Sequence, residues 1–185
     1  MRKLFRSGGL ALGVAFGLLV LATLVAAQGS SPVVDARMVL AADGAHSGST
    51  VKAAVVAEVK PGYHINDHKP TLDYLIPTEV KLDPSSDFEV ASLVYPKGTA
   101  RRFAFSDEPL SVYEGTLLVG AVLKISPSAR PGAYTLKGKL NYQACSEQAC
   151  LPPTSVPVSL ELKVVPRSTP VKQANAEVFN RIAFN

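Results

Sequence analysis

Hydrophobic and polar residues alternate in short stretches along most of the chain, and Pro and Gly residues separate these stretches. An alternation with a period of two is typical of β-strands that bury one face. The pattern predicts strands over residues 33–40, 51–59, 78–82, 88–94, 117–125, 134–142 and 156–164. Because no stretch between them has a helical period, we expect an all-β fold, an immunoglobulin-like antiparallel β-sandwich over residues 31–165.

The end of the chain departs from this pattern. Residues 166–170 contain two prolines and predict a linker. Val171, Ala174, Val178 and Ile182 then recur at helical spacing. This spacing predicts a short amphipathic helix that docks on the sandwich or on a partner. A frayed tail over residues 166–185 is the alternative, and the pattern does not decide between the two.

The start of the chain has the composition of an export signal. Basic residues lie near the N-terminus, residues 8–24 carry no charge, and small residues lead up to Ala27. This order predicts a signal peptide over residues 1–27, with cleavage after Ala27 favoured over an uncleaved anchor. In both cases we expect the rest of the chain to be exported, outside the cytoplasm. If the segment is not cleaved, we expect it to tether the protein to the membrane.

The signal segment also accounts for most of the net charge. The chain has 19 basic and 15 acidic side chains, and three of the basic ones precede residue 8. The remainder is nearly neutral and has no basic patch with interleaved aromatic residues. We therefore expect no nucleic-acid partner.

Cys145 and Cys150 are the only cysteines, and they lie between the last two predicted strands. An even number of cysteines in an exported protein predicts one intramolecular disulfide. The chain has no tryptophan, so this pair is not the inter-sheet bridge of antibody domains, which packs on a Trp. Its role is open between a metal pair, a structural staple and a redox couple.

A metal site is the weakest of these interpretations. A structural zinc ion needs four ligands, and the cysteines supply two. His64 and His68 have a spacing that suits a helix, but the prolines around them predict a loop. We therefore expect no metal and no cofactor.

The staple and the redox couple are harder to separate from spacing alone. A loop of about six residues gains only ~2 kcal/mol from closure, so a staple is weakly motivated. Redox pairs of the thioredoxin type sit at a helix N-terminus, where the dipole lowers a thiol pKa. Pro152-Pro153 after the pair makes such a helix unfavourable. The pair therefore suits exchange with a partner through a mixed disulfide.

The stretch YQACSEQACLPP resembles the N-terminal periplasmic domain of the thiol:disulfide interchange protein DsbD. VKPGYHINDHKP and VYPKGTARRFAFSDEPLSVYEG are similar to two further segments of that family. The resemblance implies an immunoglobulin-like fold that carries reducing equivalents. It implies as partners a thioredoxin-like exported protein, a DsbD-type membrane electron carrier, and oxidised exported proteins as acceptors.

The resemblance also implies roles for individual residues. Cys150 forms the mixed disulfide with partners, and Cys145 resolves it. A cap loop within residues 103–113 shields the pair with an aromatic ring, for which we choose Phe105, with Phe103 as the alternative. The chain departs from the family in lacking the membrane carrier and the thioredoxin-like domain, so we expect a free-standing version.

Further residues are predicted near the site. Asn66 falls where relatives often have an aromatic ring, which puts the local packing in question. Tyr63, His64, Tyr142 and Glu147 are the other candidates, with packing or solvated roles as alternatives. Two functional hypotheses follow: a thiol–disulfide interchange module, and a non-catalytic binding or adaptor sandwich with a structural disulfide.

Overall fold

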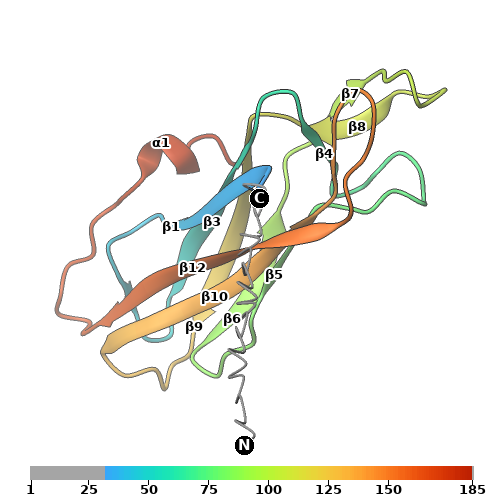
Figure 1. The fold of residues 1–185 in the computed structure, drawn as a ribbon. Coiled ribbons are helices and arrows are strands. Elements are labelled where there is room, and N and C mark those ends of the chain that lie inside the picture. Colours follow the sequence, from blue (N-terminus) through green and yellow to red (C-terminus); the bar gives the residue numbers. More distant parts are fainter. Residues whose placement is uncertain (1–31, 185) are drawn as a thin grey trace, which may run out of the picture. The chain divides into compact units, whose positions relative to one another are not determined.

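The computed structural model describes residues 32–184 (Figure 1). The predicted signal segment, residues 1–27, lies outside the described residues. Two sheets of four strands face each other across one core. The first consists, in spatial order, of β1 (Val34–Leu40), β3 (Thr50–Val59), β9 (Thr116–Ile125) and β6 (Phe88–Val94). The second consists of β2 (Ala45–His46), β12 (Thr154–Val165), β10 (Gly132–Tyr142) and β5 (Glu79–Leu82).

Pairing within both sheets is antiparallel, apart from the short parallel contact of β2 with β12. The prediction of an all-β, immunoglobulin-like sandwich is confirmed. Each predicted strand is present, with bounds that differ by at most two residues from the pattern.

The core follows directly from the alternation in the sequence. In β3 and β9, every second residue points between the sheets, and the two strands pair so that Val55 lies opposite Val119. Leu136 and Leu140 of β10 and Leu162 of β12 fill the core from the other sheet, and all three are at most 1% exposed. Burial of these aliphatic side chains stabilises the sandwich by about 1.5–3 kcal/mol for each residue.

A third, smaller sheet lies at one end of the sandwich and was not predicted. It consists, in spatial order, of β11 (Ala144–Cys145), β4 (His64–Asn66), β8 (Leu110–Tyr113) and β7 (Thr99–Arg101). Figure 1 shows β4, β7 and β8 together at this end, beside several loops. The expectation that His64 lies in a loop was therefore wrong. Three of its strands, β4, β7 and β11, have only two or three residues, too few to give a readable alternation, and pairing to neighbours holds them.

The C-terminal segment forms one helical turn, α1 (Ala176–Phe179), and docks on the sandwich. Val178 is 7% exposed and packs on Ala54, Val56 and Leu118, which lie on the outer face of the first sheet. The helix is shorter than its spacing predicted because residues 172–175 are bound to the chain after β1. The Ala174 N–H donates to the Ala41 carbonyl, and the side chain of Asn175 donates to the Leu40 carbonyl.

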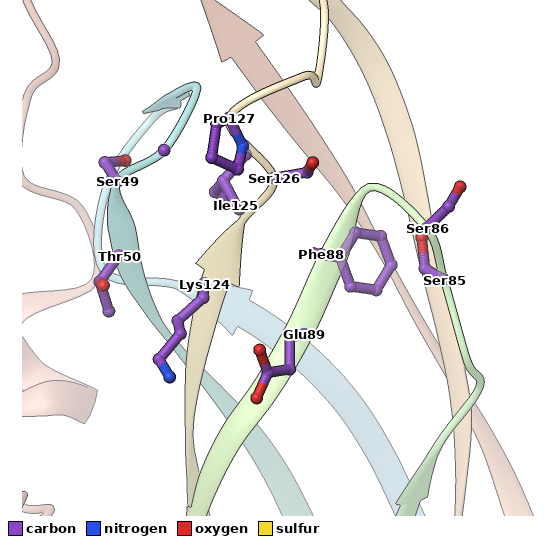
Figure 2. A pocket seen from close by; sticks show the side chains of 11 residues that line it. Ser49, Thr50, Ser85, Ser86, Phe88, Glu89, Lys124, Ile125, Ser126 and Pro127 are labelled. Atoms are coloured by element: carbon purple, nitrogen blue, oxygen red, sulfur yellow. The ribbon is translucent and has the colours of Figure 1, made fainter.

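Two further features complete the architecture. A pocket lies where β3 and β6 begin and β9 ends, at the opposite end of the first sheet from the third sheet; Figure 2 shows Phe88, Glu89 and Lys124 around it. In the described part of the chain, no helix has the length and apolar character needed to cross a membrane.

Candidate redox site

Cys145 and Cys150 form a disulfide that closes a tight hairpin, with Cα atoms 3.9 Å apart. Cys145 ends β11, and Cys150 pairs with it in an antiparallel bridge. The Leu151 N–H donates to the Ala144 carbonyl at 2.8 Å, and the Ser146 N–H donates to the Ala149 carbonyl at 2.9 Å. No helix follows the pair, since Pro152-Pro153 leads directly into β12. The disulfide therefore lies in extended backbone, without the helix dipole of thioredoxin-type sites.

The two cysteines differ in their access to solvent. Cys145 is 1% exposed, whereas Cys150 belongs to an exposed run that begins at Glu147. A thiolate that attacks a disulfide must reach the sulfur along the S–S axis, so access helps to decide which sulfur reacts. Cys150 therefore lies at the surface, whereas Cys145 lies inside.

The register of the third sheet places His64 beside the disulfide. Cys145 lies directly opposite His64, and Ala144 lies opposite Ile65. Ile65 and Ala144 belong to the main core, so the alternation turns His64, Asn66 and Cys145 to the other face of the sheet. Directly opposite residues have Cβ atoms about 4.5–5.5 Å apart, so the imidazole and the buried sulfur are neighbours.

This face is covered by a second apolar cluster. Phe103, Leu110 and Val112 are buried there, with Leu72 and Leu75 packed against them. The Phe103 ring stacks on the imidazole of His64, with centroids 4.1 Å apart. Phe105 stacks in turn on Phe103 at 5.2 Å and is 44% exposed. The three rings form a stack that runs from β4 to the surface of the loop over residues 102–109.

The predicted cap region is thus a loop followed by a strand, because its last four residues, Leu110–Tyr113, form β8. The two aromatic residues have different surroundings: Phe103 is 5% exposed and anchored, while Phe105 is the outer ring. The apolar pair Leu72 and Leu75 was missed by sequence reasoning. Leu72 and Leu75 lie at a spacing of three in the connection between Pro70 and Pro77, which is the signal that could have found them.

Two polar atoms beneath this cluster have no partner. In the described residues, the buried side-chain atoms without a hydrogen bond are Nε2 of His64 and Oδ1 of Asn66. Both side chains are at most 3% exposed, and both lie on the disulfide face of β4. The Asn66 amide nitrogen donates to the Ile76 carbonyl at 2.9 Å, which orients its oxygen. Burial lowers the pKa of His64 from its ordinary value of 6.5, so the ring is neutral at pH 7.

The remaining predicted residues lie further out or in the main core. Tyr142 is 2% exposed and belongs to the core between the sheets. Burial raises the pKa of Tyr142 above its ordinary value. Tyr63 is half-buried and packs against the same core, and Glu147 is exposed in the turn between the cysteines.

A polar network supports β4 and β8 from behind. The carboxylate of Asp67 accepts hydrogen bonds from the Ser111 and Tyr113 hydroxyls and from the Gly98 backbone N–H. A Cβ atom at Gly98 would lie 2.6 Å from this carboxylate, so the close approach requires glycine. The network joins the end of β4, the third sheet and the turn before β7.

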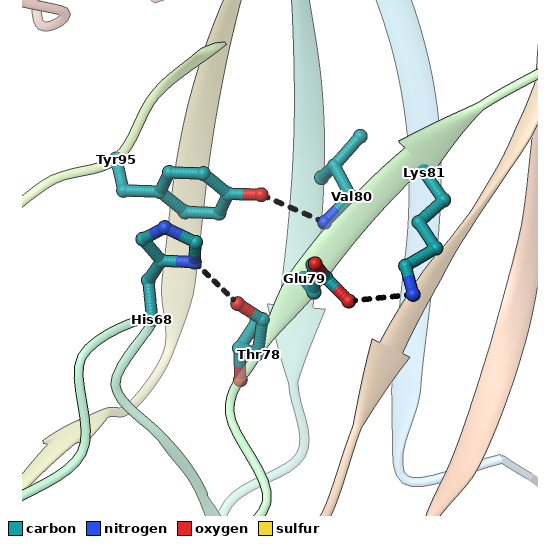
Figure 3. A network of polar contacts seen from close by, with 6 residues as sticks. All are labelled: His68, Thr78, Glu79, Val80, Lys81 and Tyr95. Carbon is teal, nitrogen blue, oxygen red and sulfur yellow. Dashed lines mark hydrogen bonds and ion pairs between the residues drawn. The ribbon is translucent and has the colours of Figure 1, made fainter.

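The segment after Asp67 is held by a second set of contacts, drawn in Figure 3. The rings of His68 and Tyr95 stack with centroids 3.7 Å apart. His68 Nδ1 lies 3.1 Å from the Thr78 carbonyl oxygen, and the Tyr95 hydroxyl accepts a hydrogen bond from the Val80 N–H. His68 is therefore engaged at the edge of β5 and is not part of the disulfide face.

The site contains no cluster suited to a metal ion. Over residues 32–184, no group of three or more His, Cys, Asp and Glu side chains is placed to hold one.

Fold and site together define an immunoglobulin-like sandwich that carries a half-buried disulfide in a hairpin at one end. The profile of the family described as "Thiol:disulfide interchange protein DsbD, N-terminal" matches residues 34–162, which include both cysteines. The chain belongs to this family.

Solved structures with similar folds include two domains from this group of proteins. The N-terminal periplasmic domain of ScsB from Proteus mirabilis is 18% identical, with a TM-score of 0.46, covering 72% of this chain and 47% of that chain. The reduced DsbD N-terminal domain from Neisseria meningitidis is 18% identical, with a TM-score of 0.38, covering 72% of this chain and 89% of that one. This chain therefore spans about half the length of the ScsB chain.

A type I cohesin of ScaB from Pseudobacteroides cellulosolvens is also similar, at 11% identity and a TM-score of 0.41, covering 72% of this chain and 96% of that chain. Comparison with curated protein sequences gives no match. All three TM-scores lie below 0.5, so the assignment of the chain to its family rests on the match to the family profile.

Proposed function

We propose that the domain is an exported thiol–disulfide interchange module that passes reducing equivalents through Cys145 and Cys150. The observation that carries the proposal is a disulfide with one buried and one exposed cysteine, within the segment that matches the family profile. The proposed partners are a thioredoxin-like exported protein, a membrane electron carrier of DsbD type, and oxidised exported proteins. The proposed location is the periplasm.

The proposed exchange has two balanced steps. A partner thiolate attacks the sulfur of Cys150, which forms a mixed disulfide and releases Cys145 as a thiolate that takes up a proton. A second partner thiolate then attacks the mixed disulfide at the partner sulfur. The partner leaves oxidised, and Cys150 also becomes a thiol. Two electrons and two protons have entered the domain, and the reverse sequence delivers them to an oxidised acceptor.

The surface around the disulfide suits a protein partner. The large hydrophobic residues that are most exposed in the described part of the chain are Tyr74, Ile76, Phe105 and Leu151, at 39–76%. All four lie on the segments that flank the third sheet and the disulfide hairpin. Exposed apolar groups that gather around a reactive bond are typical of a docking surface.

The loop over residues 102–109 is the proposed cap. Phe103 anchors it on His64, and Phe105 is the outer ring that a docking partner displaces. An apolar cover over this face of the sheet disfavours the approach of small charged thiolates, which lose hydration on entering.

A trapping experiment tests the proposal. The Cys145→Ala variant is activated at Cys150 with dithiobis(nitrobenzoate), and a reduced thioredoxin-like protein without its resolving cysteine is added. We expect a covalent adduct on a non-reducing gel. The matched Cys150→Ala variant, activated at buried Cys145, is expected to give much less adduct.

Two results would count against the proposal. Adducts formed only through Cys145 would reverse the roles of the cysteines. A wild-type disulfide that resists glutathione and dithiothreitol down to roughly −300 mV, together with no adduct from either variant, would identify a structural bond.

A further inference from the structure

The unpartnered atoms beneath the cap have a common feature: both can accept a hydrogen bond. His64 Nε2 accepts when the ring proton is on Nδ1, and Asn66 Oδ1 is an acceptor in every state. A buried polar atom without a partner costs about 1–3 kcal/mol, so two on one face require an explanation. The sulfurs of the disulfide carry no hydrogen and have nothing to donate. Reduction supplies two S–H groups, one of them on buried Cys145 directly opposite His64.

We infer that His64 Nε2 is the proton acceptor for the Cys145 thiol in the step that resolves the mixed disulfide. The inference rests on the proposed function and deepens it, because it assigns the group that activates the buried cysteine. Three observations carry it: the Cα pairing of His64 with Cys145, the burial of His64, which is 3% exposed, and its unpartnered ring nitrogen.

With the partner sulfur bound to Cys150, the Cys145 S–H gives its proton to Nε2, which makes a thiolate and an imidazolium. The thiolate attacks the Cys150 sulfur, the Cys145–Cys150 bond forms, and the bond from Cys150 to the partner breaks. The partner leaves as a thiolate with the electron pair and takes the proton from His64. The partner is reduced, the domain is oxidised, and the imidazole returns to its neutral form.

The surroundings of His64 suit this role. The Phe103 ring covers one face of the imidazole and excludes water. The charged groups around it are Glu114 and Glu147, which favour the imidazolium, and Arg101, which disfavours it. Arg101 is paired with Glu114 at 3.5 Å, so part of its charge is neutralised. Burial outweighs the two carboxylates and lowers the pKa of His64, which keeps the base unprotonated and available at pH 7.

The pH dependence of ring closure tests the inference. The reduced protein is mixed with one equivalent of dithiobis(nitrobenzoate) in a stopped-flow instrument. The first thionitrobenzoate released reports attack by Cys150, and the second reports attack by Cys145 on the mixed disulfide. In the wild-type protein we expect a second phase that is nearly independent of pH between 6 and 8. An unassisted thiol with a pKa near 8.5 is only about 1% ionised at pH 6.5.

Two variants remove the base in different ways. His64→Phe keeps the aromatic stack on Phe103, and His64→Gln keeps a polar group without a titrating nitrogen. At pH 6.5 we expect both to slow the second phase by roughly tenfold or more, with the difference shrinking toward pH 8.5. The first phase should be unchanged. His68→Gln is the matched control, because His68 lies four residues further along the chain and contacts Tyr95 and Thr78 instead. This variant should keep the wild-type pH profile.

Equal second-phase rates at pH 6.5 in the wild type and in either folded His64 variant would overturn the inference. A nuclear magnetic resonance titration tests it without mutation. The His64 titration midpoint and the Nε2 shift are expected to change on reduction. Identical His64 curves in both redox forms would also overturn it. If ring closure depends on His64 but no adduct forms with a thioredoxin-like protein, the proposed function fails while this inference stands.

Discussion

The side chain of Asp67 holds together the strands and the turn that support the candidate site. It is 8% exposed, and its carboxylate accepts four hydrogen bonds, from two hydroxyls and from the backbone N–H groups of Lys69 and Gly98. Burial alone would raise the pKa of Asp67, but these hydrogen bonds outweigh it and leave the pKa below the ordinary value of 3.8. The charged form is therefore the one that stabilises the fold.

The sign of the pH dependence follows from this shift. A carboxyl group with a lowered pKa in the folded state stabilises fully above its unfolded pKa, near 3.9, and loses this contribution as the pH falls through the folded value. We expect Asp67→Asn to lower the free energy of unfolding by about 2 kcal/mol at pH 7, since hydrogen bonds to a charged group are lost. Near pH 3 the difference from the wild type should shrink. Urea unfolding at both pH values measures it.

Asp73→Asn is the matched control, because Asp73 is exposed in the following loop. It should change the free energy of unfolding by less than about 0.5 kcal/mol at either pH. A deficit in Asp67→Asn that is equal at pH 7 and pH 3 would contradict a role for the charge.

At the scale of elements, the sequence predicted the strands whose residues alternate between buried and exposed. It missed the short strands that are held in place by pairing to their neighbours. The long strands were readable because one face is apolar over seven or more residues, as in β1 and β3. β4 has three residues, all buried, so it shows no alternation. Its position comes from ladder bonds to β8 and β11, which are distant in sequence. The position of His64 opposite Cys145 could not be predicted for this reason.

The C-terminal segment is a second case in which contacts between residues distant in sequence decide the structure. Ala54 and Val56 are apolar at positions of β3 that alternation assigns to the outer face, which was a sign that something covers them. The sequence left a docked helix and a frayed tail open and could not fix the length of the helix. A Cβ atom at Gly120 would lie 2.8 Å from Ile182, so the absence of a side chain there lets the segment lie close to the sheet. Docking of the segment therefore depends on residues about sixty positions apart.

The outer ring of the cap loop, Phe105, should control how fast small thiols reach the disulfide. Phe105→Ala removes the outer ring but leaves Phe103 on His64, so the free energy of unfolding should fall by no more than about 1 kcal/mol. A stacking contact worth about 1 kcal/mol favours the closed loop over the open loop by roughly fivefold. We therefore expect dithiothreitol to reduce the disulfide about fivefold faster in this variant. The rate of reduction is measured by trapping free thiols over time.

Tyr74→Ala is the control for the cap, because Tyr74 is an exposed aromatic residue on the neighbouring loop, 76% exposed. It should leave the rate of reduction unchanged. Equal rates for Phe105→Ala and the wild type would remove Phe105 from the shield and leave Phe103 as the remaining candidate.

At the scale of the whole molecule, the disulfide and the main core are separate. The core between the two large sheets draws its residues from strands of both and does not include either cysteine. The bond joins residues five apart, so it restrains only a short loop of the unfolded chain. Closure of so small a loop stabilises by ~2 kcal/mol, against roughly 5–15 kcal/mol for a typical domain. A sandwich of this size can therefore open its disulfide and stay folded.

This separation predicts the response to loss of the bond. We expect the Cys145→Ala/Cys150→Ala variant to keep its β-sheet circular dichroism and a cooperative urea transition, with the free energy of unfolding lowered by about 2–3 kcal/mol. Reduction of the wild type should cost no more than this, because both thiols remain and the buried one gains His64 as an acceptor. A double variant that is unfolded in native buffer would show that the disulfide is a structural staple. A variant that stays folded agrees with a bond that is free to open and close during exchange.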